Sequence, residues 1–397
     1  MTDTPASQPS GAAQPSRPLR VLHVISGLGL GGAEAMLFRV VTHPSTVEHR
    51  VVCLSGPDWY SRELQRCGVE VEHLNINAGS NGLAATARLF RLIRRSGADV
   101  VQGWMYRSNL LAALAAKTKG IPSVWGIHNS SLEPLSFRAK LWVYASGAVA
   151  GWAPSYVINC SNRSARLHEA LGFGRAPGRV VHNGHQSEIF FPDEAVRARV
   201  RGELGIGPGT FLLGSVARWH VQKDHPNLLA AMRILKERGV TDFKCLFVGH
   251  EMNEENGAMV EAIAREGLQQ SVIALGPRGD VPDIMRALDV HVLASCGGEA
   301  FPNVVAEAML CGTPCVVTDV GDAAFMVEQN GWVAPPRDPA ALASGIEAAC
   351  RQFRDDPAGW AARCAAARER IASRFTLEAM AREYEAIWRE VAKRPAA

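Results

Sequence analysis

The sequence lacks the cysteine spacing of a disulfide-linked or zinc-binding protein. Nine cysteines are scattered along 397 residues, and no two of them form a Cys-x-x-Cys pair. Most stand in apolar surroundings, where cysteine serves as a small core residue. The pattern argues against a disulfide framework and a zinc site, and it is typical of a protein from a reducing compartment.

A strong excess of charge of one sign is also missing. The formal net charge is +3, which by itself does not indicate a nucleic-acid partner. Apolar residues make up 47% and charged residues 20%, which is the balance of a soluble globular chain. A length of 397 residues is too great for one ordinary core, so we expect two domains.

The N-terminus lacks the apolar run of a signal peptide. Residues 1–18 are rich in Ser, Pro and Ala, and we predict a disordered tail there. A charge-free stretch, Leu141–Cys160, is interrupted by two glycines and a proline. We interpret it as a buried helix, a turn and a strand, with a membrane span as the weaker alternative. These features favour a cytoplasmic protein.

Apolar, β-rich runs alternate with helical patterns along most of the chain. They are continuous Val, Ile and Leu runs, which is typical of parallel strands covered on both faces. In the first half we predict strands at Arg20–Ile25, Arg50–Leu54, Val69–Leu74, Asp99–Trp104, Ser123–Ile127, Tyr156–Cys160 and Arg179–His182. In the second half we predict them at Phe211–Val216, Phe243–Val248, Val272–Leu275, Val290–Ala294 and Pro314–Thr318.

The alternation is interrupted at residues 186–209, which contain two prolines and end in Gly-Ile-Gly-Pro-Gly. We predict a linker there. It separates a first domain at 19–185 from a second at 210–375, and each domain is expected to be an α/β unit with a doubly wound parallel sheet. A final amphipathic helix within 376–397 is expected to pack back on the first domain.

A glycine-rich turn follows the first expected strand. Gly27, Gly29 and Gly32 satisfy the pattern Gly-x-Gly-x-x-Gly, and a helix is expected directly after it. Such a turn lets the backbone approach a phosphate at a helix N-terminus. A dinucleotide-binding dehydrogenase would also need an acid at the end of the second strand, which ends here without one. Two interpretations remain: a turn without a ligand, and a loop at Gly31 and Gly32 that faces a diphosphate across an interdomain cleft.

A sharper signal follows the expected strand at Val290–Ala294. The segment Gly297-Gly298-Glu299-Ala300-Phe301-Pro302 leads into a helix, at the carboxyl end of a parallel strand, where open α/β sheets bind ligands. The first amides of that helix, at Asn303 and Val304, can receive a phosphate. Glu307 lies one helical turn beyond Asn303 and can reach a ribose diol. The alternative for Glu307 is a solvated helix residue.

These residues resemble the signature of the GT-B glycosyltransferases of family 4, which are retaining enzymes that use nucleotide sugars. The signature is a Glu, seven residues and a second Glu, with Phe-Pro shortly after the first, and Glu299 and Glu307 fit it. Arg218 and Lys223 match the cations that neutralise the donor diphosphate in that family, with a surface ion pair as the alternative. The resemblance covers roughly residues 20–390.

The resemblance implies a GT-B fold of two Rossmann-like domains that face a central cleft, and a retaining hexosyltransferase. The donor would be a UDP- or GDP-sugar, and no metal or other cofactor is expected, which agrees with the absence of an Asp-x-Asp motif. The catalytic residues would be Glu299, His128, Arg218 and Lys223. The donor-binding residues would be Glu307, Phe301, Pro302, Asn303, Val304, Gly298 and Ala300, and the diphosphate loop would contain Gly31 and Gly32.

The match has departures. Ala217 stands where the family has a glycine, and His185-Gln186 replaces the usual Val-Asp after Asn183-Gly184. Phe325 takes the place of a Glu that often follows the turn at Thr318–Asp322. The resemblance gives His185-Gln186 no role.

The sequence indicates the acceptor less clearly than it indicates the donor. Residues 82–120 contain only one acid, Asp99, but seven basic residues. These are Arg88, Arg91, Arg94, Arg95, Arg107, Lys117 and Lys119. The expected helix at 82–95 is basic and amphipathic, as helices on anionic membrane surfaces are, and a solvated helix face is the alternative. A glycan or polyprenyl-linked acceptor of surface polysaccharide assembly would fit a protein that is peripheral on the inner face of the membrane.

Other functions stay open. A GT-B nucleotide-sugar epimerase would share the fold and the donor site but need no acceptor. A non-catalytic nucleotide-sugar-binding subunit is a further alternative, although the presence of all four charged site residues favours an enzyme. Nucleic acid is not an expected partner.

Overall fold

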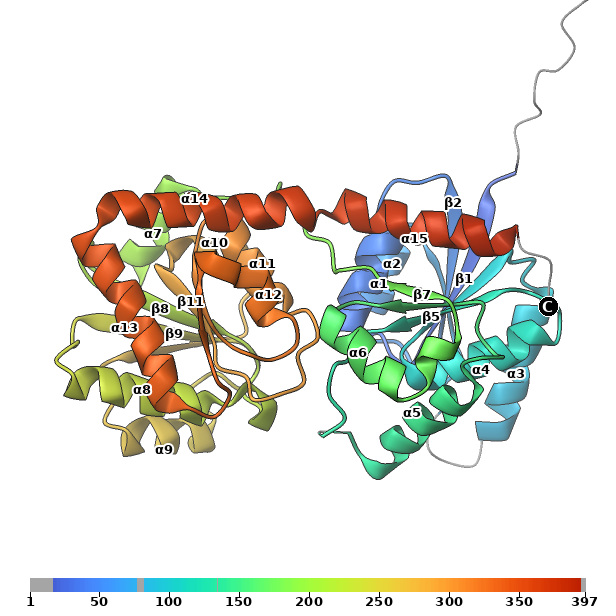
Figure 1. Cartoon of the computed structure of the whole chain (residues 1–397), viewed down its shortest axis with the longest axis horizontal. Helices are drawn as coiled ribbons and strands as arrows, with labels where there is room; N and C mark the ends of the chain where they lie inside the picture. The colour runs from blue at the N-terminus through green and yellow to red at the C-terminus, as the bar shows by residue number, and fades with distance from the viewer. Residues whose placement is uncertain (1–16, 77–81, 134, 394–397) are drawn as a thin grey trace, which may run out of the picture.

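The computed structural model describes residues 17–76, 82–133 and 135–393. The first 16 residues of the expected tail lie outside this range. Two α/β domains lie side by side along the longest axis of the molecule (Figure 1). Each has one parallel sheet, and the strand orders are β3-β2-β1-β4-β5-β6-β7 and β10-β9-β8-β11-β12-β13. Both orders are doubly wound, as the sequence predicted.

The first domain alternates strands and helices. Its elements are β1 (Leu19–Ile25), α1 (Gly32–Thr42), β2 (Val47–Cys53), α2 (Trp59–Arg66), β3 (Glu70–His73), α3 (Gly82–Arg95), β4 (Val100–Trp104), α4 (Tyr106–Lys117), β5 (Ser123–Ile127), α5 (Phe137–Val149), β6 (Tyr156–Asn159), α6 (Asn162–Ala170), η1 (Phe173–Arg175) and β7 (Gly178–Val180). Apolar side chains of α1 and α2 cover one face of the sheet, and those of α3, α4 and α5 cover the other.

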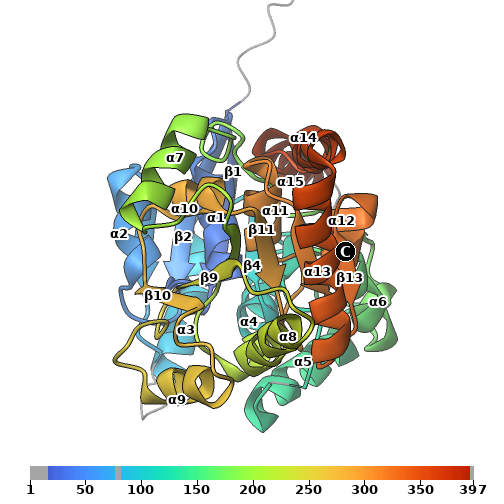
Figure 2. The same ribbon diagram turned by 90° about the vertical axis from the view of Figure 1, so that its left-hand side faces the viewer.

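The second domain repeats the pattern (Figure 2). Its elements are α7 (Glu194–Glu203), β8 (Phe211–Val216), η2 (Val221–Lys223), α8 (His225–Glu237), β9 (Phe243–Val248), α9 (Gly257–Arg265), β10 (Val272–Gly276), α10 (Val281–Ala287), β11 (Val290–Leu293), α11 (Asn303–Leu310), β12 (Cys315–Thr318), α12 (Ala323–Val327), η3 (Glu328–Asn330), β13 (Trp332–Ala334), α13 (Pro339–Asp355) and α14 (Pro357–Arg374). The edge strand β13 was not predicted.

The range 186–209 contains the helix α7, which packs against α10 of the second domain. Arg201 of this helix is buried and forms an ion pair with Asp289 at 3.1 Å, just before β11. The chain crosses between the domains at His185 and again at Phe375–Leu377. The two crossings are joined, since the His185 amide donates to the Phe375 carbonyl at 2.9 Å and the Leu377 amide donates to the His185 carbonyl at 3.0 Å.

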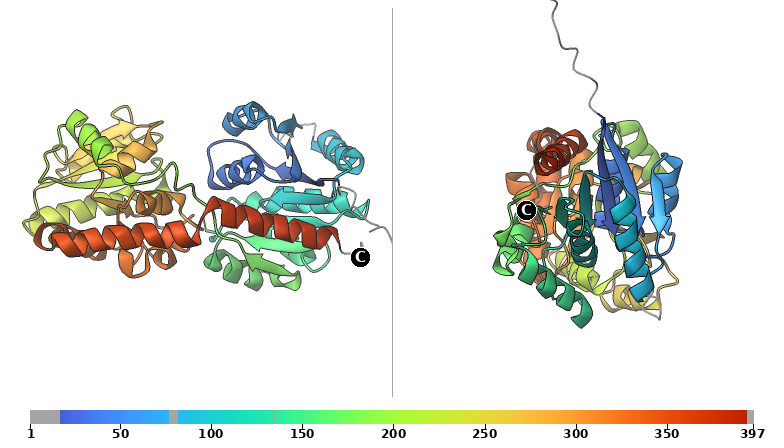
Figure 3. Two further views of the ribbon diagram at one scale, coloured as in Figure 1. Left: turned by 90° about the horizontal axis from the view of Figure 1, so that it is seen from above. Right: turned by 90° about the vertical axis from the view of Figure 1, so that its right-hand side faces the viewer.

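The last helix, α15 (Leu377–Ala392), continues from α14 and lies along the first domain (Figures 1 and 3). Tyr384 and Trp388 are buried in the core that also contains residues of α1 and β1. The Trp388 indole donates to the Gln102 side chain of β4 at 3.0 Å. The end of the chain therefore completes the core of the domain with which the chain begins.

One prediction about burial is wrong. The charge-free range Leu141–Cys160 contains a helix, a turn and the strand β6, but the helix, α5, is not buried. Val143 faces the core, whereas Leu141 and Tyr144 are exposed. Apolar composition predicted burial, but α5 lies on the outside of the domain and only one of its faces meets the core. In the described part of the chain, no helix combines the length and the apolar character that crossing a membrane requires.

Candidate active site

A cavity of about 390 Å³ lies between the two domains. Loops at the carboxyl ends of strands from both sheets surround it, as expected for open α/β sheets. Its lining contains Leu30, Gly31, Gly32, His128, Cys160, Asn183, Val216, Ala217, Arg218, Lys223, Gly298, Glu299, Ala300, Phe301, Pro302, Asn303 and Val304. Of the candidate site residues, Glu307 alone is absent from this lining.

The loop between β11 and α11 forms one wall. Gly298 has φ +73°, and a Cβ there would meet the Gln222 side chain, so only glycine fits without strain. Pro302 occupies the N-cap position of α11, and no side chain among the described residues caps this helix. The Asn303 and Val304 amides therefore begin a helix whose N-terminus borders the cavity, where partial positive charge favours an anion.

A lysine and a glutamate meet in the cavity. Lys223 Nζ lies 2.5 Å from Glu299 Oε1, and the Ser295 hydroxyl donates to the same oxygen at 2.8 Å. Glu299 Oε2 takes no hydrogen bond from the described residues. The Ser130 hydroxyl of the first domain donates to the Glu299 carbonyl, so this loop is also held from the opposite domain.

Arg218 adds a second cation at the end of β8. Its side chain is exposed and forms no hydrogen bond or ion pair with the described residues. The pKa of the nearby His220 is lowered by partial burial, and further by the charges of Arg218 and Lys223. The electrostatic potential at this end of β8 is therefore positive, as a phosphate site requires.

His128 lies at the end of β5 and is neutral at physiological pH. Burial lowers its pKa to about 4. Its ring stacks on Trp104, with centroids 5.2 Å apart and planes at 19°. Both ring nitrogens are buried without a hydrogen-bond partner in the described part of the chain, so the imidazole can donate to and accept from a ligand in the cavity.

The glycine loop after β1 faces the same cavity. Gly31 is the N-cap residue of α1, and a Cβ at this position would collide with the Glu34 carboxylate. Burial, and then the charge of Asp58, raises the pKa of Glu34, while its own backbone hydrogen bond acts in the opposite direction. Gly31 and Gly32 therefore line the cavity at the start of α1.

The Glu307 side chain does not line the cavity and is bound by an arginine of the first domain. Its Oε1 accepts from Arg39 of α1 at 3.0 Å, and both side chains are largely buried. Arg39 also donates to the Gly184 carbonyl at 3.0 Å, so it ties α1, the domain crossing and α11 together. The sequence placed Glu307 on the correct helix, but the partner comes from the other domain, 268 positions away.

Two residues without a predicted role also join the domains. Asp322, after β12, accepts from the Asn162 amide at 2.7 Å and from the Arg163 amide at 3.0 Å, and so it caps α6 of the other domain. Burial raises the pKa of Asp322, but hydrogen bonds, that of His182 first, outweigh this effect and lower it overall. Asn183 donates to the Asn303 side chain at 3.0 Å. Asp322 and Asn183 both lie in segments that resemble the family, and this resemblance was the sequence feature that could have identified them.

Metal ligands are not grouped in the described residues, which contain no cluster of three or more His, Cys, Asp or Glu side chains that could hold an ion. All nine cysteines are free thiols.

The two sheets, and the cavity between their carboxyl edges, define the GT-B fold of glycosyltransferases. Residues 31–184 match the glycosyl transferase 4-like domain, and residues 210–352 match the glycosyl transferases group 1 family. The chain therefore contains both domains of a glycosyltransferase and is homologous to bacterial glycosyltransferases.

The relatives come from several bacteria. EpsF of Bacillus subtilis (strain 168) is 28% identical over 316 residues, which are 76% of this chain and 79% of EpsF. The UDP-Gal:alpha-D-GlcNAc-diphosphoundecaprenol alpha-1,3-galactosyltransferase of Escherichia coli is 24% identical over 241 residues, which are 58% of this chain and 60% of that protein. The structure of Anabaena HepE in complex with UDP has a TM-score of 0.83 at 22% identity, over 94% of this chain and 100% of HepE.

Proposed function

We propose that this protein transfers a hexose or N-acetylhexosamine from a UDP- or GDP-sugar to a glycan or polyprenyl-linked acceptor, with retention of anomeric configuration, in surface polysaccharide biosynthesis. The observation that carries the proposal is the cavity between the domains, where two cations, a carboxylate and a helix N-terminus meet. HepE has been crystallised with UDP and with UDP-glucose, and the Escherichia coli relative is named for a diphosphoundecaprenol acceptor, which supports both substrate classes.

The diphosphate would lie between Arg218, Lys223 and the first amides of α11. Charge develops on this group as the bond to the sugar breaks, and fixed donors lower the barrier most when they point at that charge. Arg218 has no partner among the described residues and can turn to the phosphates. Lys223 would exchange part of its contact with Glu299 for the incoming anion.

The sugar would lie between Glu299 and His128. Lys223 and Ser295 hold one oxygen of Glu299, which leaves the other for sugar hydroxyls. Because the imidazole of His128 is neutral, it would act as a hydrogen-bonding group and not as a cation. Contact between the domains would exclude water from the reacting centre.

The decisive experiment is donor binding by variants of the two cations. We expect Arg218→Ala and Lys223→Ala to bind UDP- or GDP-sugar at least about tenfold more weakly, because each loses a hydrogen bond to a charged group. Arg265→Ala, at an exposed arginine of α9, is the matched control and should bind like the parent. Titration calorimetry measures all three, and undiminished binding by the first two would contradict the proposal.

Donor turnover separates the epimerase and the non-catalytic subunit from the transferase. With donor alone, the proposed enzyme should produce no epimerised sugar, and with an acceptor it should release nucleoside diphosphate. Nuclear magnetic resonance spectra of the incubated donor show which of these occurs, and the anomeric coupling of the product tests retention.

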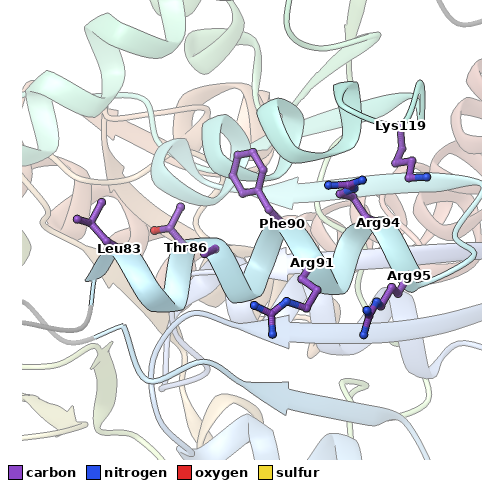
Figure 4. A pocket seen from close by; sticks show the side chains of 8 residues that line it. Leu83, Thr86, Phe90, Arg91, Arg94, Arg95 and Lys119 are labelled. Carbon is purple, nitrogen blue, oxygen red and sulfur yellow. The ribbon is translucent and has the colours of Figure 1, made fainter.

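For the acceptor, we propose that the basic helix α3 faces an anionic membrane surface. A groove of about 730 Å³ on α3 contains four cationic side chains, and no acid lines it. Figure 4 shows Arg91, Arg94 and Arg95 along α3, Leu83 at its beginning and Lys119 on a neighbouring segment. Such a surface attracts anionic lipids. Unchanged vesicle binding after Arg91, Arg94 and Arg95 are replaced by Glu would contradict this assignment.

A further inference from the structure

The imidazole of His128 has no hydrogen bond that sets its plane. Both ring nitrogens are buried without a partner in the described part of the chain, although the residue lines the cavity. A histidine that acts on a ligand is usually oriented by a hydrogen bond to its second nitrogen. The orientation of His128 must therefore come from packing, and the ring that packs against it is the indole of Trp104.

Trp104, the last residue of β4, is fully buried and is itself held by two histidines. Its indole N–H donates to Nδ1 of His23 at 3.1 Å. Burial, and then the charge of His49, lowers the pKa of His23 well below its ordinary value, so the His23 ring is neutral. Because its Nδ1 accepts, the proton of this ring is on Nε2, which donates to Nδ1 of His49 at 2.9 Å. This chain of hydrogen bonds fixes the rotation of the indole.

A third ring comes from the last helix of the chain. Tyr384 of α15 stacks on Trp104, with centroids 5.8 Å apart and planes at 13°. Its hydroxyl is buried and takes no hydrogen bond from the described residues, which is unfavourable for a polar group. The position therefore uses the ring of the tyrosine and not its hydroxyl. We refer to Tyr384, Trp104 and His128 as the ring stack.

The ring stack is connected to the second domain through α15. This helix continues from α14, which packs against α11. Arg368 of α14 donates to the Leu310 carbonyl at the end of α11, and α11 begins at Asn303 in the wall of the cavity. The same pair of consecutive helices therefore contacts one wall of the cavity and supplies the ring that supports Trp104 behind the other wall.

We propose that Trp104 and Tyr384 are positioning residues, which hold the imidazole of His128 at the angle at which it meets the sugar of the donor. This assignment rests on the proposed function, in which the sugar is the group that His128 contacts. Hydrogen bonds weaken steeply when donor and acceptor are misaligned, and a misplacement of about 1 Å can lower a rate about 100-fold. Loss of either ring should therefore lower kcat, whereas the contacts to the diphosphate, and with them most of the donor affinity, remain.

Steady-state kinetics of the full chain test the ring stack. We expect Tyr384→Leu to lower kcat at least about tenfold with little change in the KM of the donor, and Tyr384→Phe, which keeps the ring, to retain the parent's kcat. Trp104→Phe, which keeps a ring but loses the donor to His23, should show a smaller loss. The matched control is Trp125→Phe, at an equally buried tryptophan of β5 that packs in a different core cluster, and it should behave like the parent. Parent-like kcat in both Tyr384→Leu and Trp104→Phe would overturn the proposal.

A double-mutant cycle separates positioning from a general loss of stability. In a His128→Gln background, Tyr384→Leu should have little further effect on kcat, because the tyrosine ring acts through the imidazole that is already missing. An equal fold-loss in the parent and in the His128→Gln background would overturn the proposal, since the ring would then act on the fold as a whole.

The orientation of His128 also has a readout that needs no activity. In nuclear magnetic resonance spectra of the histidine side chains, the ring signals of His128 are those that His128→Gln removes, and stacking on an indole should displace them. We expect these signals to move in Tyr384→Leu and to stay in place in Trp125→Phe. Unmoved signals in an active Tyr384→Leu enzyme would contradict the positioning role alone. Signals that move in a chain whose parent neither binds a nucleotide sugar nor transfers sugar would contradict the proposed function and leave the ring stack intact.

Discussion

At the scale of single residues, two carboxylates of the candidate site are each paired with a cation, whereas Arg218 has no partner among the described residues. Lys223 pairs with Glu299, and Arg39 pairs with Glu307. The sequence could predict that Glu299 precedes a helix and that Glu307 lies on it, because Pro302 between them marks the start of α11. It could not predict their partners, since each pair joins positions far apart in the chain and depends on how the domains meet.

The pair of Arg39 and Glu307 leads to a prediction about the ribose. A diol that binds Glu307 must share or displace Arg39, so Arg39→Met should leave donor affinity equal or higher. Glu307→Ala should weaken donor binding by about tenfold or more, because it removes the carboxylate that accepts from the ribose hydroxyls. Calorimetric titration of both variants with the donor measures this, and parent-like affinity of Glu307→Ala would exclude the ribose role.

At the scale of elements, the fold follows from hydrophobic patterning, and its exceptions have physical causes. The continuous apolar runs predicted twelve of the thirteen strands in the described part of the chain, because strands covered on both faces need such runs. The patterning could not tell the two faces of α5 apart, since apolar residues occupy both. It also could not show that α6 is capped by Asp322 from the other domain.

The helix α15 supplies a prediction about stability. Trp388 is fully buried against the first sheet, so Trp388→Ala should lower the free energy of unfolding by about 3–5 kcal/mol. Trp59→Ala, at an exposed tryptophan of α2, should lower it by less than about 1 kcal/mol. Chemical denaturation measures both. Equal effects would mean that α15 does not complete the core of the first domain.

At the scale of the whole molecule, buried histidines make the fold sensitive to acid. Burial is the largest cause that lowers the pKa of His49, His128 and His168, in each case to about 4. In the unfolded chain the same groups titrate near about 6.5. The unfolded chain therefore binds protons more readily than the folded one between these values, and acid favours unfolding.

The predicted pH dependence has a definite sign. Stability should be constant above about pH 7 and fall as the pH decreases from about 6.5 toward 4, by about 2 kcal/mol at pH 5 for each histidine with a folded pKa of about 4. Urea denaturation at pH 7.5 and pH 5 measures the difference, and His168→Gln should reduce it if the variant folds. Equal stability at the two pH values would contradict the neutral, buried state of these rings.

The central claim is that the cavity between the domains binds a nucleotide sugar, and thermal unfolding in the presence of UDP-sugars, GDP-sugars and NAD tests it most directly. A ligand that binds only the folded state raises the unfolding midpoint, and the rise grows with the logarithm of the ratio of ligand concentration to Kd. We predict a clear rise with sugars of one nucleotide class, a much smaller rise in Arg218→Ala, and none with NAD. A rise with NAD alone, or no rise with any nucleotide sugar, would contradict the account.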